Sequence, residues 1–118
     1  MSGPSSSVPE AARELLAVLE RYGLHVGQLT GRWMDAELYH TVSVELDAIR
    51  HSCQRLPGLS SPWIGLLIAH AELMHELWQA SSAPPGSPMT ERHRLLAKLH
   101  EQLRQLQAQC TRLGGGSA

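Results

Sequence analysis

Apolar residues recur three or four positions apart along most of this chain, which is the period of an α-helix that buries one face. The clearest stripe lies in the middle of the sequence and consists of Met34, Leu38, Val42, Leu46, Ile49, Cys53 and Leu56. The opposite face of the same segment carries charged side chains, such as Glu45 and Arg50. We therefore expect a helix that begins near Thr30 and ends at Pro57-Gly58.

A shorter helix is predicted before this stripe. Ser7 is placed to cap it, Pro9 suits a first turn, and Glu10 follows Ser7 at the spacing of a capping box. The apolar residues Ala11, Ala12, Leu15, Val18, Leu19 and Tyr22 then recur at helical spacing. Gly23 is expected to end this helix after about four turns, because glycine is the usual residue just beyond a helix C-terminus.

A third helix is predicted to begin at Ser60-Ser61-Pro62, a capping residue followed by proline in the first turn. From Trp63 to Ala69 this helix has no charged residue, and its apolar side chains cover every side. A helix of that kind has to be buried all round, either by its own fold or by a partner. Its later turns are amphipathic.

A fourth helix is expected after Ser87-Pro88, and it carries a heptad seam. The seam positions are Met89, Arg92, Leu96, Leu99, Leu103, Leu106, Cys110 and Leu113, with Arg92 as the one polar break. No segment alternates as a strand does. The predicted fold is all-α: a single helical domain over residues 8–113, built as a small bundle of about four helices and dimeric, between flexible tails at 1–7 and 114–118.

Composition narrows the possible functions. The 118 residues include ten basic and eleven acidic side chains, so the net charge is −1, whereas a general polyanion binder would be strongly basic. No Lys or Arg occurs from Leu56 to Thr90, which argues against DNA contact through the third helix. The sequence contains no Gly-rich phosphate loop, serine-nucleophile motif or Cys-x-x-Cys, so we expect neither an enzyme nor a cofactor.

The expected location is the cytoplasm, because the N-terminal residues lack the basic and apolar pattern of a signal peptide and no stretch suits a membrane span. Two cysteines are too few for a disulfide scaffold. Cys53 and Cys110 both fall on apolar seams, where we interpret them as small core residues. Whether either cysteine forms a bridge is left open by the sequence.

A doubled Glu-x-x-His motif offers one alternative function. Glu37 and His40 lie on the second predicted helix, and Glu72 and His75 lie on the third. Carboxylate-bridged metal bundles use such pairs, but they also need a further glutamate from each of the other two helices. Nothing singles out those partners here, so solvated helix faces are the preferred interpretation and no metal site is assigned.

Two apolar surfaces exceed what one small bundle is expected to hide. We expect partner binding at Trp63, Ile64, Leu67 and Ile68, together with Met34 and Leu38 on the second helix. We expect self-association as a homodimer along Leu96, Leu99, Leu103 and Leu106. Tryptophan suits the centre of an interface, although it is also a good core residue.

Two stretches resemble a known family: Trp33-Met34-Asp35-Ala36-Glu37-Leu38-Tyr39-His40 and Pro62-Trp63-Ile64-Gly65-Leu66-Leu67-Ile68-Ala69-His70. They look like the corresponding parts of the QslA family of quorum-sensing antiactivators. The resemblance implies an all-α dimer that binds the ligand-binding domain of a LuxR-type transcription factor, LasR. Binding would block dimerisation of that regulator and hence its hold on DNA. A helical chaperone or adaptor module is the other alternative.

Overall fold

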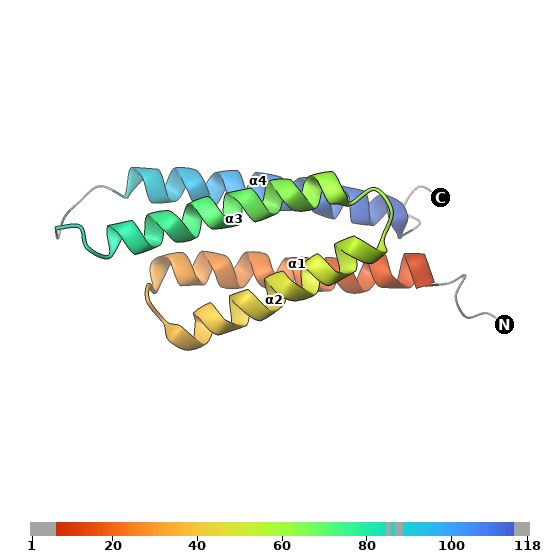
Figure 1. Ribbon diagram of the computed structural model, residues 1–118, viewed down its shortest axis with the longest axis horizontal. Coiled ribbons are helices and arrows are strands. Elements are labelled where there is room, and N and C mark those ends of the chain that lie inside the picture. Colours follow the sequence, from red (N-terminus) through yellow and green to blue (C-terminus); the bar gives the residue numbers. More distant parts are fainter. Residues whose placement is uncertain (1–6, 85, 87–88, 115–118) are drawn as a thin grey trace.

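The computed structural model describes residues 7–84, 86 and 89–114 of the chain, and these form four α-helices with no strand among them (Figure 1). The helices are α1 (Ser7–Gly31), α2 (Ala36–Arg55), α3 (Ser60–Ala80) and α4 (Thr90–Leu113). The all-α expectation is therefore confirmed. Most of both expected tails, residues 1–6 and 115–118, lies outside the described residues, as do the predicted helix breakers Ser87-Pro88.

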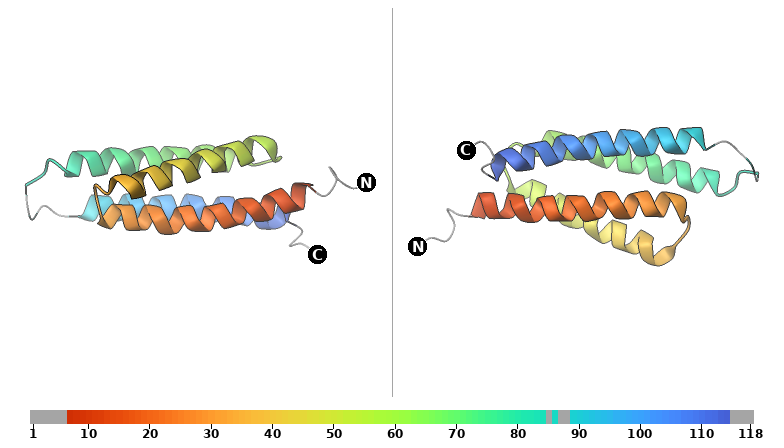
Figure 2. Two further views of the ribbon diagram at one scale, coloured as in Figure 1. Left: turned by 90° about the horizontal axis from the view of Figure 1, so that it is seen from below. Right: turned by 180° about the vertical axis from the view of Figure 1, so that it is seen from behind.

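The helices form an elongated bundle in which one neighbouring pair is splayed. α4 packs along both α1 and α3, and α1 also packs along α2. By contrast, α2 and α3 approach each other over a short length only. Figures 1 and 2 show why: α2 crosses α1 at an angle and nears α3 mainly at the end where the two helices are joined. α2 therefore covers only a short part of α3.

The first helix is longer than the sequence predicted. It passes through Gly23 and Gly27 and ends at Gly31, so the expectation that Gly23 ends it was wrong. The reason is tertiary packing: a Cβ atom at Gly23 would lie 2.7 Å from Cδ2 of Leu103 on α4. The absence of a side chain at Gly23 lets α4 approach α1 closely. An interior glycine costs roughly 1 kcal/mol of stability relative to alanine, and the helix continues in spite of it.

The second helix begins later than predicted, at Ala36 instead of near Thr30. Asp35 is its N-cap, and the Asp35 carboxylate accepts a hydrogen bond from the backbone N–H of Leu38 at 3.1 Å. Thr30 lies instead at the buried end of α1, where its hydroxyl donates to the carbonyl oxygen of Val26 at 2.9 Å. Met34 consequently sits in the α1–α2 connection and not on a helix.

One continuous core runs the length of the bundle. Its fully buried large side chains include Tyr22, Leu15, Leu19, Leu29, Ile49, Leu59, Leu66, Leu73, Leu77, Leu99, Leu106 and Val26. On α4 the buried seam contains Leu95, whereas Leu96, the residue predicted there, is half-buried. Over the described part of the chain, no helix has both the length and the hydrophobicity that crossing a bilayer demands.

Candidate docking face

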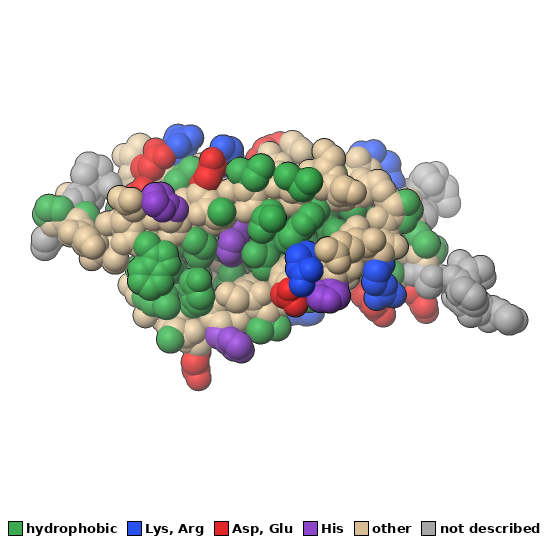
Figure 3. Space-filling view, viewed as in Figure 1, with side chains coloured by type: hydrophobic (Ala, Val, Ile, Leu, Met, Phe, Trp, Pro, Cys, Tyr) green, Lys and Arg blue, Asp and Glu red, His purple; other side chains and the backbone are tan. Residues whose placement is uncertain are grey.

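The side of α3 that faces away from the core carries large apolar residues in contact with solvent. Ile64 is 51% exposed, Leu67 40%, Ile68 51% and Trp78 52%. Ala71, also exposed, completes a row in which residues 64, 71 and 78 are seven positions apart. We call these five residues the α3 face; their spacing is that of a helix seam meeting another helix. Figure 3 shows hydrophobic side chains gathered over α3 and over the region between α3 and α2.

The inner side of the same helix is buried. Trp63, Leu66, Ala69, Leu73, Met74 and Leu77 all contribute to the core. Residues 63–69 therefore serve two surfaces, which explains why this part of the sequence is apolar on every side. The residues predicted for partner binding divide accordingly: Ile64, Leu67 and Ile68 are on the outer side, whereas Trp63, at 8% exposed, belongs to the core.

The two residues predicted for partner binding on the second helix, Met34 and Leu38, differ in exposure. Met34 is 45% exposed and lies beside Trp78 at one end of the α3 face. Leu38 is half-buried and packs against the core. Of the pair, only Met34 extends the apolar surface at Trp78.

A hollow of about 210 Å³ lies beside the first half of the α3 face, between α2 and α3. It is lined by Ser43, Leu46, Asp47, Arg50, Trp63 and Leu67. Its walls are mainly apolar, and one edge is formed by an ion pair between Arg50 and Asp47. The volume of this hollow is about that of one large side chain.

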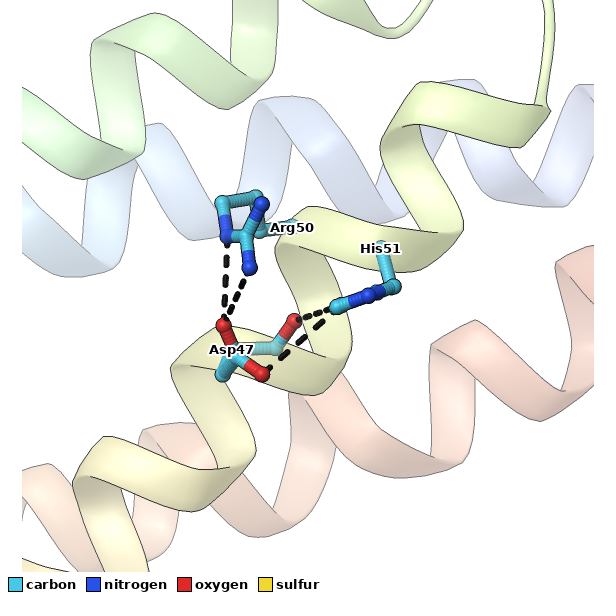
Figure 4. Close-up of polar contacts among 3 residues, drawn as sticks. All are labelled: Asp47, Arg50 and His51. Atoms are coloured by element: carbon cyan, nitrogen blue, oxygen red, sulfur yellow. Dashed lines mark hydrogen bonds and ion pairs between the residues drawn. The ribbon is translucent and has the colours of Figure 1, made fainter.

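The ion pair at that edge is joined by two hydrogen bonds. Arg50 donates from Nη2 and Nε to Oδ1 of Asp47, at 2.6 and 3.2 Å, and His51 lies 3.7 Å from Oδ2 (Figure 4). The hydrogen bonds from Arg50 lower the pKa of the Asp47 carboxyl. The pair thus neutralises itself, so the edge offers polarity to a partner without a net charge.

A second hollow, of about 310 Å³, lies at the other end of the α3 face. Its lining residues are Trp33, Met34, Leu77, Trp78, Ala80, Ser81 and Arg92. The rings of Trp33 and Trp78 meet edge to face, with centroids 5.1 Å apart and planes at 89°. The sequence had marked Arg92 only as a polar break in the α4 seam, and its nearness to two tryptophans was not predictable from spacing.

The leucines predicted for self-association lie inside the monomer. Leu99, Leu103 and Leu106 are 0–5% exposed, and they fill the space where α4 meets its neighbours. Only Leu96 is half-exposed. A dimer that used the buried leucines would first have to open the bundle, so the α4 seam closes the fold of one chain.

The doubled Glu-x-x-His motif does not converge. Glu72 pairs with Lys98 at 3.0 Å, and His75 is hydrogen-bonded to Gln79 at 3.1 Å. Glu37 and His40 lie exposed on α2. Within the described ranges, no group of three or more Asp, Glu, His or Cys side chains is placed to hold a metal ion.

One partly buried polar contact between helices was not predicted from the sequence. The Tyr22 hydroxyl and Nδ1 of His70 share a hydrogen bond of 2.8 Å across α1 and α3. Burial lowers the pKa of His70 to about 4 and raises that of Tyr22, so both side chains are neutral. A histidine and a tyrosine forty-eight positions apart give no sequence signal of pairing, and the pair has the character of a satisfied core hydrogen bond.

Both cysteines are buried free thiols, as their places on apolar seams predicted. Burial raises the pKa to about 12 for Cys53 and about 11 for Cys110. Thiols with such pKa values are poor nucleophiles at neutral pH. These side chains therefore act as small apolar residues of the core.

Comparison of the chain with protein-family models, with curated proteins and with solved structures finds no match.

Proposed function

We propose that this protein is a non-enzymatic, protein-binding regulator and that the α3 face is its docking surface. The observation that supports this most directly is the exposure of Ile64, Leu67, Ile68 and Trp78 in one row along a helix. The row is interrupted between Ala71 and Trp78 by the exposed polar residue His75. Exposed apolar surface of this kind on a small domain is typical of a protein–protein contact. Tryptophan and large aliphatic residues at its centre are the side chains that most often dominate binding energy.

The proposed partner is the ligand-binding domain of a LuxR-type quorum-sensing transcription factor similar to LasR. This choice rests on the two stretches that resemble the QslA family, Trp33–His40 and Pro62–His70. Both stretches border the docking surface: the first supplies Met34 at one end, and the second supplies Ile64, Leu67 and Ile68. The part of the chain that carries the resemblance is thus also the part that is apolar and exposed.

The proposed mechanism is competition. A transcription factor that holds DNA as a dimer loses that hold when a second protein covers its dimerisation surface. No chemical step is required, because mass action suffices if the inhibitor binds the regulator monomer more tightly than the monomer binds itself. A typical stable interface buries about 1,600 Å² in total, and the α3 face would form its central part.

Ile68→Arg tests the proposal. The change places a charge in the middle of the docking surface, so binding to the purified ligand-binding domain should fall at least tenfold, and inhibition of DNA binding should fall with it. Because Ile68 is 51% exposed, the helical circular dichroism should stay unchanged. Calorimetric titration and a DNA-retention assay give the two readouts.

Leu24→Arg is the matched control, since Leu24 is 62% exposed on α1 and lies off the α3 face. It should leave binding intact. The proposal fails if the unaltered protein does not bind the ligand-binding domain, or if Ile68→Arg binds it as well as Leu24→Arg does.

A further inference from the structure

The hollow at the end of the α3 face has an electrostatic character that the rest of this surface lacks. Arg92 lines it together with Trp33 and Trp78. The other cations along the middle of α4 are paired: Arg94 with Glu91, Lys98 with Glu72, and Arg104 with Glu101. No carboxylate lies within ion-pair distance of Arg92 among the residues that the structure describes.

Arg92 is also placed where positive charge is disfavoured. It lies in the first turn of α4, where the backbone N–H groups already produce a positive potential. The nearest acidic residue in the sequence, Glu91, is used by Arg94 through hydrogen bonds of 3.0 Å and 2.5 Å. The end of the α3 face therefore carries a positive charge without a local counter-ion.

Two N–H donors in the walls of this hollow are unsatisfied. Within the described part of the molecule, Nε1 of Trp33 and Nε of Arg92 are shielded from solvent and have no hydrogen-bond acceptor. Buried donors in folded proteins are almost always satisfied, and an exception calls for a missing acceptor. Both exceptions occur in side chains that line the same hollow.

We infer that this hollow receives an acidic side chain of the partner, an Asp or Glu carried at the end of an amphipathic helix that lies along the α3 face. The inference deepens the proposed docking function and rests on it. Arg92 is only half-buried, so a carboxylate can reach its side chain and supply the counter-ion that it lacks. The same carboxylate brings negative charge beside the two unsatisfied N–H groups. The adjoining methylene groups of an Asp or Glu suit the apolar ring surfaces of Trp33 and Trp78.

The two hollows set the spacing on that partner helix. Leu67 lines the first hollow and Trp78 lines the second, and they are eleven residues apart on α3. Eleven residues correspond to about 16 Å along a helix axis. The partner helix therefore presents an apolar anchor to the first hollow and its acidic residue about three turns away, with apolar residues between them.

A pair of synthetic helical peptides tests the inference on the intact protein. Both peptides carry the same leucine stripe, and they differ only at the two ends of the stripe, where one has Glu and the other Gln. Acidic residues at both ends make the test independent of peptide orientation. Binding is followed by calorimetry and by tryptophan fluorescence, for which Trp33 and Trp78 are local reporters.

The Glu peptide should bind the unaltered protein about tenfold more tightly than the Gln peptide. This preference should disappear in Arg92→Gln, persist in part in Arg92→Lys, and be unchanged in Arg112→Gln, which removes a charge from the opposite end of α4. It should also weaken as salt concentration rises, as expected for a partly exposed charge pair.

Equal affinity of the two peptides, or a preference that survives in Arg92→Gln, would overturn the inference. If neither peptide binds, the inference is likewise overturned. The proposed docking function is tested separately, by binding of the ligand-binding domain to the unaltered protein and to Ile68→Arg. Hexanoate titrated alone provides a separate arm: saturable binding of hexanoate without any peptide preference would assign the hollow to a free carboxylate and contradict a partner side chain.

Discussion

At the scale of single residues, Gly23 shows how a missing side chain sets the distance between two helices. A Cβ atom at this position would lie 2.7 Å from Cδ2 of Leu103, which is itself 5% exposed and packed in the core. Gly27, one turn further along α1, has no neighbouring atom within 4 Å of the same point. The two glycines thus differ in packing while sharing one helix.

Valine at each position gives a matched comparison. Gly23→Val should destabilise the protein by about 1–3 kcal/mol, because the added atoms have to displace Leu103 within a packed core. Gly27→Val should change the stability by less than about 0.5 kcal/mol, since its methyl groups enter open space. Urea unfolding followed by circular dichroism measures both. Equal effects at the two positions would show that α1 and α4 are not in close contact at Gly23.

His70 makes the stability depend on pH in a predictable direction. Its pKa is lowered to about 4 by burial, whereas a histidine in an unfolded chain titrates near 6.5. Between pH 4 and pH 6.5, His70 is protonated in the unfolded chain and neutral in the folded protein. The contribution of His70 to the folding stability should therefore be constant above pH 6.5 and fall below it, by up to about 1.4 kcal/mol per pH unit.

His70→Gln isolates this contribution, because glutamine does not titrate and can still share a hydrogen bond with the Tyr22 hydroxyl. The loss of unfolding free energy between pH 7 and pH 5 should be smaller in the variant than in the unaltered protein. That interval lies above the range in which the carboxylates titrate. An identical pH dependence in the two proteins would place His70 in contact with solvent.

At the scale of elements, the starts of α3 and α4 were predictable and the end of α1 was not. Ser60-Ser61-Pro62 carries a local signal for a helix start, and the helix does begin at Ser60. The predicted serine cap was wrong, because the N-cap is Leu59 and no side chain caps the helix. The role of Gly23 depends on Leu103, eighty positions away, and no local pattern contains that contact. A glycine that permits close packing and a glycine that ends a helix look alike in a sequence.

The same limit applies to which side of an apolar helix faces inward. Residues 63–69 are apolar all round, so the sequence predicted a surplus of hydrophobic surface but placed Trp63 with Ile64 on the docking side. On α4, Leu95 and Leu96 both fit a heptad seam, and only packing against the other helices selects Leu95. Periodicity identifies amphipathic elements, whereas the neighbouring helices decide the rotation of each one about its axis.

At the scale of the whole molecule, the crossing of α2 over α1 decides which apolar surface stays open. α4 is covered by α1 and α3, so its leucine seam is buried within a single chain. α3 is covered by α4 on one side but barely by α2 on the other. An elongated bundle with one splayed pair therefore fills its own core and still presents the α3 face.

This division predicts the result of placing two lysines in the α4 seam. In Leu99→Lys with Leu103→Lys, two side chains that are 0% and 5% exposed become charged. Removing a buried leucine costs about 2–5 kcal/mol before any charge is buried, and a small domain has about 5–15 kcal/mol of stability. The double variant should therefore lose its helical circular dichroism and its cooperative unfolding transition.

Ala97→Lys with Ala108→Lys adds the same charge at exposed positions of α4 and should leave both the helical signal and the unfolding transition intact. If the seam joined two chains instead, the first variant would remain helical and sediment as a smaller species, because lysine would then break an interface and leave each chain folded.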